Sequence, residues 1–278
     1  MARVFIDDSG SSAEEPLMWV AGWVGQVRTW DVFTDAWHKA LIAKNPKPIR
    51  YFKHHEARSL TGCFAKFSDT EANTKVIHLA KVIADHSLYG NHSVYGVIYY
   101  AFRPFLNAMI SKHAVNPVHQ NLKDPFFICI NSLIGYVLGS ESAKYPNDKV
   151  DFIFDGKPGS KQANRLIAMF ELVKETQAEP LPSLMGSAIP MNDMDVLPLQ
   201  AADLWAGQAR LAFLEKRPRD PEPLALLRRE VPMWIKLVDE ETIRATISYH
   251  NFGISTRRLH TFKRERESRE RKNQKESQ

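Results

Sequence analysis

The sequence is poor in cysteine and has no long hydrophobic run. Two cysteines in 278 residues, Cys63 and Cys129, are too few for a disulfide framework or a cysteine-based zinc site. The longest apolar stretch, residues 126–138, is interrupted by polar residues and is well short of the roughly 20 residues that span a membrane. Two aspartates at positions 7 and 8 precede any apolar region of the kind found in signal peptides. The sequence therefore predicts a soluble, cytoplasmic protein without a membrane partner.

The excess of positive charge lies at the C-terminal end. The chain carries 37 basic and 32 acidic residues, a net charge of +5. Residues 256–278 hold nine basic and four acidic residues, which accounts for the whole excess. The net charge is therefore no evidence for a basic groove on the rest of the chain. Residues 256–278 are either a solvated terminus or an arm that attracts nucleic-acid phosphates.

Apolar periodicity predicts strands that alternate with helices, and hence an α/β fold with a mixed central sheet and helices on both faces. We expect one domain over residues 1–216 with helical insertions, followed by a C-terminal helical extension, residues 217–255, that packs on it. Residues 256–278 are expected to be an exposed or disordered tail. The predicted strands cover residues 3–7, 17–24, 49–53, 92–100, 150–154 and 187–190, and the predicted helices cover residues 30–42, 68–86, 124–139, 160–174 and 198–216.

Aspartates stand where a sheet of this kind would present them. Asp7 and Asp8 follow the first apolar run, and Asp155 ends the predicted strand Asp-Phe-Ile-Phe-Asp. Open α/β sheets bind ligands at the ends of their strands. Taken singly, each of these segments also fits a simple turn, because aspartate, serine and glycine favour turns.

The predicted helix at residues 198–216 carries a narrow polar stripe on an otherwise apolar surface. Gln200, Asp203, Gly207 and Arg210 recur at helical spacing. A buried carboxylate such as that of Asp203 stays charged only beside a cation, a metal or several hydrogen-bond donors. An ion pair with Arg210 or Arg3 is the structural alternative to metal binding.

Two motifs resemble those of a known family. Phe-Ile-Asp-Asp-Ser-Gly at residues 5–10 is similar to the opening Asp-Glu-Ser-Gly motif of the domain-of-unknown-function family numbered 3800. Leu-Gln-Ala-Ala-Asp-Leu-Trp-Ala-Gly at residues 199–207 resembles the late Leu-Gln-x-Ala-Asp motif of that family. The resemblance spans about residues 3–215. It implies a ribonuclease-H-like fold, in which carboxylates from the first strand, a later strand and the last helix hold divalent metals. Asp8 replaces the family's glutamate and is one methylene shorter.

The residue types favour Mg²⁺ or Mn²⁺, since hard divalent cations prefer oxygen ligands, and such ions assist phosphodiester hydrolysis. We predict that Asp7, Asp155 and Asp203 are the catalytic metal ligands, with Asp8 and Asp195 as further candidates. The candidates for substrate binding are Lys157, Gln200 and Arg210.

These expectations lead to two functional hypotheses. The first is a divalent-metal-dependent nuclease or phosphodiesterase that hydrolyses nucleic acid. The alternative is a catalytically inert ribonuclease-H-like scaffold that binds nucleic acid or a protein partner. A phosphatase with Asp7 as nucleophile is disfavoured, because Ser9 stands where a second aspartate is needed. The segment His54-His55-Glu56 is interpreted as polar surface, although one of its histidines could serve as a mobile general base.

Overall fold

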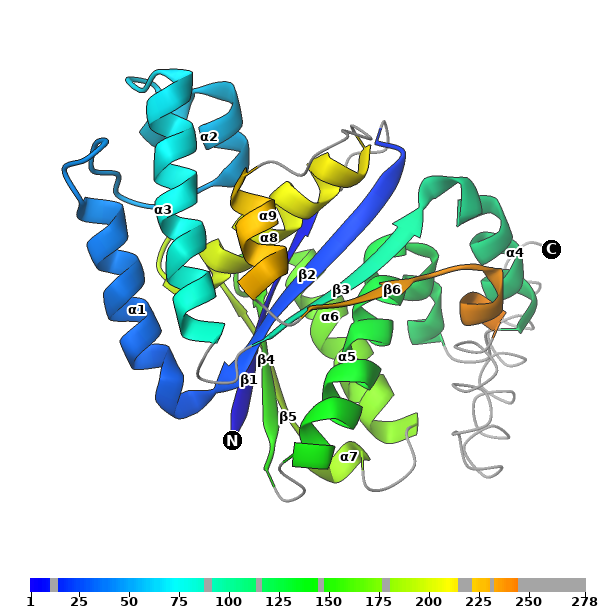
Figure 1. Ribbon diagram of the computed structural model, residues 1–278. Helices are drawn as coiled ribbons and strands as arrows, with labels where there is room; N and C mark the ends of the chain where they lie inside the picture. Colours follow the sequence, from blue (N-terminus) through cyan, green and yellow to red (C-terminus); the bar gives the residue numbers. More distant parts are fainter. Residues whose placement is uncertain are drawn as a thin grey trace.

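The computed structural model has an α/β architecture built on one mixed sheet (Figure 1). It describes residues 1–10, 15–87, 92–113, 117–144, 148–176, 181–214, 222–230 and 233–244. The strands are β1 (Ala2–Ser9), β2 (Leu17–Gln26), β3 (His92–Tyr99), β4 (Val150–Asp155), β5 (Met185–Met191) and β6 (Met233–Leu237). Their order in the sheet is β5-β4-β1-β2-β3-β6. The predicted α/β class is confirmed.

Strand β1 lies inside the sheet, between an antiparallel and a parallel neighbour. It pairs with β2 in antiparallel and with β4 in parallel orientation. On one side the sheet continues through β3, antiparallel to β2, and then through β6, parallel to β3. On the other side β5 runs parallel to β4. Three neighbouring strands, β1, β4 and β5, therefore end at the same edge of the sheet.

Helices cover both faces of the sheet, as Figure 1 shows. One face packs against α1, α3, α8 and α9, and the other against α4, α5 and α6. The predicted strand at residues 187–190 is part of β5. The helices are α1 (Val27–Ile42), α2 (His54–Ser59), α3 (Asp69–Ser87), α4 (Arg103–His113), α5 (Pro125–Lys144), α6 (Lys161–Thr176), α7 (Leu181–Leu184), α8 (Leu197–Leu214) and α9 (Glu222–Glu230), with 3₁₀ turns at Gly62–Phe64, Tyr100–Phe102 and Pro117–Lys123.

Side-chain alternation along the strands decides which residues face α8. Successive side chains of a strand point to opposite faces of the sheet. In β1, Val4 and Ile6 belong to the core beneath α5 and α6, whereas Phe5 belongs to the core beneath α1 and α8. In β4, Phe154 lies in the first of these cores and Ile153 in the second. By the same alternation, the side chains of residues 7 and 155 are directed to the face covered by α8.

The predicted strand at residues 49–53 is wrong, because the described structure contains no strand there. The backbone N–H of Phe52 donates to the Gln200 side chain, and that of His54 donates to the Asp203 side chain. The donors that a strand would use in a sheet ladder are thus bound to α8. These two hydrogen bonds hold residues 52–54 against α8.

The remaining expectations concern the membrane and the C-terminal end. Within the described part of the chain, no helix is both long enough and apolar enough to cross a membrane. The predicted C-terminal extension, residues 217–255, contributes α9 and β6. Helix α9 packs against α3, and β6 pairs with β3 at the edge of the sheet. The charged segment 256–278 lies outside the described residues.

Candidate metal centre

The strand register brings Asp7 and Asp155 side by side. Phe5 pairs with Ile153 and Ile6 with Phe154, so the next residues along the two parallel strands are the two aspartates. Both side chains are directed to the face of the sheet covered by α8, and both residues are partly buried. Two carboxylates from separate strands therefore meet at the carboxyl edge of the sheet, where α/β sheets bind ligands.

A third carboxylate, that of Asp193, comes from the turn between β5 and α8. One oxygen atom from each of Asp7, Asp155 and Asp193 lies within 4.8 Å of the other two. The Asp193 backbone N–H donates to Asp155 Oδ1 at 3.1 Å, which fixes the turn against the end of β4. Asp193 is 1% exposed, so its charge is almost fully removed from water.

Asp203 approaches the same region from α8, which is apolar on most of its surface and packs against β1. Its Oδ2 accepts a hydrogen bond of 2.6 Å from the His54 backbone N–H at the start of α2. One turn further along α8, Gly207 leaves room for the His54 ring, since a Cβ there would lie 2.1 Å from His54 Nδ1. No ion pair joins Asp203 to an arginine among the described residues, and Arg210 instead pairs with Glu15.

Burial and mutual repulsion raise the pKa values of these carboxyl groups. Burial is the largest cause that raises the pKa of Asp203 to about 7, and the charges of Asp193 and Asp155 add to it. Burial raises the pKa of Asp7 well above its ordinary value, helped by the charges of Asp203, Asp8 and Asp155. The pKa of Asp155 is raised by burial and then by the charge of Asp193. Clustered oxygen donors with excess negative charge suit a hard divalent cation.

Lys53 is the counter-charge at this cluster. Its Nζ lies 2.5 Å from Asp193 Oδ2. Burial acts to lower the pKa of Lys53, but the hydrogen bond and charge of Asp193, with the charges of Asp155 and Asp203, outweigh burial and raise that pKa. Among the described residues, one ammonium group thus faces several acidic side chains, so the cluster contains more acidic than basic groups.

Gln200 connects the elements that carry these residues. Its Oε1 accepts hydrogen bonds from Trp37 Nε1 and from the Phe52 backbone N–H, both at 3.1 Å. Its Nε2 donates to the Asp193 carbonyl at 2.9 Å. The side chain is fully buried. Gln200, predicted as a substrate-binding residue, is therefore placed as an internal connector between α1, the segment before α2 and the turn before α8.

The other predicted candidates lie outside the tight group. By the same alternation, the side chain of Asp8 is directed to the opposite face. Burial raises the pKa of the Cys129 thiol, and the charges of Asp124 and then Asp8 add to this effect. Asp195 is exposed and accepts a hydrogen bond from the Asn192 side chain. Lys157 is exposed in the turn after β4, two residues beyond Asp155.

Three residues of the site were missed by the sequence analysis. Asp193 lies in the same Asn-Asp-Met-Asp turn as Asp195, and only the fold shows which of the two acids faces the cluster. Lys53 is the last residue of the predicted strand at residues 49–53. His54 begins the segment interpreted as polar surface, which is wrong for His54 because that residue is 8% exposed. Burial, with the charges of Arg58 and Arg210 adding to its effect, lowers the pKa of His54 to about 4. Its ring is therefore a weak base, buried and packed against α8, which does not suit a mobile general base.

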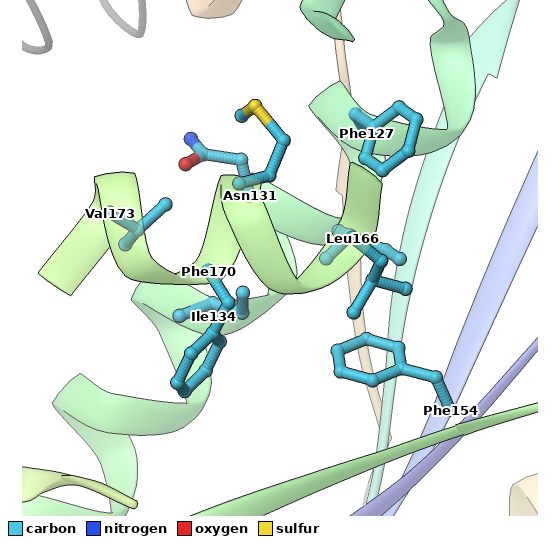
Figure 2. Close-up of a pocket in the computed structure, with 9 residues that line it drawn as sticks. Phe127, Asn131, Ile134, Phe154, Leu166, Phe170 and Val173 are labelled. Carbon is cyan, nitrogen blue, oxygen red and sulfur yellow. The ribbon is translucent and has the colours of Figure 1, made fainter. Parts of the chain in front are cut away.

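A separate hollow lies on the opposite face of the sheet, where α5 and α6 close over β4 (Figure 2). Asn131 is the polar residue of its lining, so the hollow offers no charged group to a cation or a phosphate. The lining residues are Phe127, Ile130, Asn131, Ile134, Phe154, Leu166, Met169, Phe170 and Val173.

Comparisons of the chain with models of protein families, with curated proteins and with solved structures found no match.

Proposed function

We propose that this protein is a divalent-metal-dependent phosphodiesterase that hydrolyses nucleic acid and has a ribonuclease-H-like fold. The observation that carries the proposal is the meeting of Asp7, Asp155 and Asp193 within 4.8 Å, on the face covered by the helix that bears Asp203. Each of these acids comes from a different element. Such an arrangement requires the whole fold, and no local turn preference accounts for it.

The topology supports the finer assignment of the fold. The resemblance implies carboxylates from the first strand, a later strand and the last helix of the fold. Asp7 lies on β1, Asp155 ends β4 and Asp203 lies on α8. Strand β1 lies between β2 and β4, and α8 packs against it. This placement agrees with the expectation drawn from the resemblance.

The chemistry of the donors supports Mg²⁺ or Mn²⁺ as the cofactor. A divalent cation bound by such carboxylates can lower the pKa of a bound water and neutralise charge on the leaving oxygen of a phosphodiester. The residues of this chain would supply the ligands: Asp7 and Asp155 from the sheet, Asp193 from the turn and Asp203 from α8. The His54 N–H holds Asp203 Oδ2 in place, and Lys157 is exposed in the turn after β4.

The test is incubation with single- and double-stranded DNA and RNA, with Mn²⁺, with Mg²⁺ and with chelator. We expect cleavage with either metal and none with chelator. The variant Asp155→Asn should lose cleavage and Mn²⁺ binding, whereas Asp35→Asn, at an exposed position on α1, should retain both. Metal binding without cleavage of any substrate would favour the inert scaffold. No metal binding to the wild-type protein would refute the proposal.

A further inference from the structure

Lys53 reaches the acidic cluster from the solvent side. Its Nζ contacts Asp193 Oδ2 at 2.5 Å, and its side chain is 25% exposed while that of Asp193 is 2% exposed. One side of the lysine therefore faces the buried carboxylate, and part of it remains open to solvent. A substrate that approaches the cluster would meet this side chain.

The backbone around Lys53 is held on both sides. The preceding N–H, of Phe52, donates to Gln200 Oε1, and the following N–H, of His54, donates to Asp203 Oδ2. Both acceptors belong to α8, and Gln200 also binds the carbonyl of Asp193. Lys53 and its ion-pair partner are thus anchored to the same helix, so the backbone keeps the lysine at the cluster.

The charges at the cluster favour an exchange of partners. A cation bound by Asp7, Asp155 and Asp193 would draw on the carboxylate that Lys53 occupies and would also repel the ammonium group at short range. The ammonium group is a flexible point charge with three donors, which suits it to a phosphate oxygen. A phosphodiester bound at the cation would bring such an oxygen within its reach.

We propose that Lys53 exchanges partners when the site is loaded: it holds Asp193 in the metal-free protein and contacts a non-bridging phosphate oxygen once a divalent cation and the substrate are bound. The phosphate contact rests on the proposed function, whereas the competition for Asp193 concerns the metal alone.

The first experiment measures the competition by calorimetry with Mn²⁺ as the probe. Lys53→Met removes the ammonium group and keeps an unbranched side chain, and we expect Mn²⁺ to bind roughly tenfold more tightly than to the wild type. Lys47→Met is the matched control, because Lys47 forms its ion pair with Glu71, outside the cluster. Unchanged or weaker Mn²⁺ binding in Lys53→Met would overturn the exchange.

A second variant tests the same competition if Lys53→Met does not fold. Lys53→Met leaves Asp193 buried without its ion pair, which could unfold the metal-free protein. Lys53→Gln is also neutral but keeps an N–H donor for Asp193, and thermal melting in chelator reports whether each variant is folded. Lys53→Gln should show the same tighter Mn²⁺ binding, and failure of this folded variant to do so would also overturn the exchange.

The second experiment measures the phosphate contact through binding of labelled DNA and RNA oligonucleotides, with Ca²⁺ replacing Mn²⁺ to slow cleavage. We expect the Lys53 variants to bind oligonucleotide roughly tenfold more weakly, since a charged hydrogen bond to phosphate is lost. Their KM for cleavage with Mn²⁺ should rise despite the tighter metal binding. Wild-type oligonucleotide affinity in both variants would refute the contact.

The calorimetry and the oligonucleotide-binding experiment together distinguish a failure of this inference from a failure of the proposed function. If wild-type protein binds Mn²⁺ but neither binds nor cleaves any oligonucleotide, the proposed function fails and the phosphate contact fails with it. The competition for Asp193 is then judged by calorimetry alone. If wild-type protein cleaves nucleic acid while the Lys53 variants behave like wild type in both arms, the proposed function stands and the role of Lys53 is refuted.

Discussion

Replacing Asp203 with asparagine distinguishes a metal ligand from a structural carboxylate. Asparagine keeps the shape and an oxygen that can accept the hydrogen bond from the His54 N–H, but it carries no charge. Burial raises the pKa of Asp203 from 3.8 to about 7, so the folded protein disfavours the ionised form. At about 1.4 kcal/mol per pKa unit, ionisation of this group costs the metal-free fold about 4 kcal/mol above neutral pH. The variant avoids this cost.

The expected gain in stability is smaller than that upper value. The pKa of about 7 already includes the hydrogen bond from the His54 N–H, so the reduction has another source: the asparagine amide adds buried N–H donors, and a buried donor without an acceptor costs about 1–3 kcal/mol. We therefore expect Asp203→Asn to raise the free energy of unfolding in chelator by about 1–3 kcal/mol. For a chain of this size the midpoint of thermal unfolding should rise by several degrees.

The effect should depend on pH with a defined sign. A carboxyl group whose pKa is raised in the folded state lends stability below its unfolded pKa, and this stability is lost as pH rises through the folded pKa. Wild type and variant should therefore be similarly stable near pH 4. Their difference in chelator should grow as pH rises towards 7 and level off above it.

Thermal or urea unfolding of both proteins, in chelator and with Mg²⁺, is the assay. Saturating metal at about a hundred times its Kd should stabilise the wild type by about 2.7 kcal/mol and the variant far less. The reasoning would be refuted if the variant unfolded much earlier in chelator at every pH and responded to Mg²⁺ like wild type. That result would mean that Asp203 is a structural carboxylate.

Three further replacements test the surroundings of the site. Asp193→Asn should weaken Mn²⁺ binding by roughly tenfold or more, whereas Asp195→Asn, two residues away and exposed, should leave it unchanged, as measured by calorimetry. Gln200→Leu leaves the groups that bind the Gln200 amide without partners and should lower the free energy of unfolding by about 3 kcal/mol or more in urea. Gly207→Ala places a Cβ 2.1 Å from the His54 ring, so it should lower the melting temperature at a cost of about 1–3 kcal/mol and also weaken Mn²⁺ binding.

The elements that carry their own patterns could be predicted from the sequence. The short apolar run before Asp7 and the strand that ends at Asp155 are both present, as β1 and β4. The apolar helix around Asp203 is α8, with bounds close to the predicted ones. Strands that are buried on both faces have continuous apolar sequences, so these segments could be recognised from the sequence alone.

The contributions from turns and connecting segments could not be predicted in this way. Asp193 and Asp195 share one turn and have the same chemistry, and the turn's path past the end of β4 decides which of them is buried. The prediction places a strand at residues 49–53, yet the N–H groups of Phe52 and His54 bind side chains of α8. Local sequence carries no information about a partner that lies about 150 residues away in the chain, and the fold has to supply it.

The polar stripe of α8 explains how a repulsive cluster persists inside a packed protein. Gln200 holds the turn that carries Asp193, and Asp203 holds the segment that carries Lys53. Each contact uses a polar group that would be costly to bury without a partner, so moving the carboxylates apart would break these hydrogen bonds before it relieved the repulsion. The helix therefore keeps the acids together in the metal-free protein. On the proposed function, a bound cation would relieve this repulsion, and its binding would require Lys53 to leave Asp193.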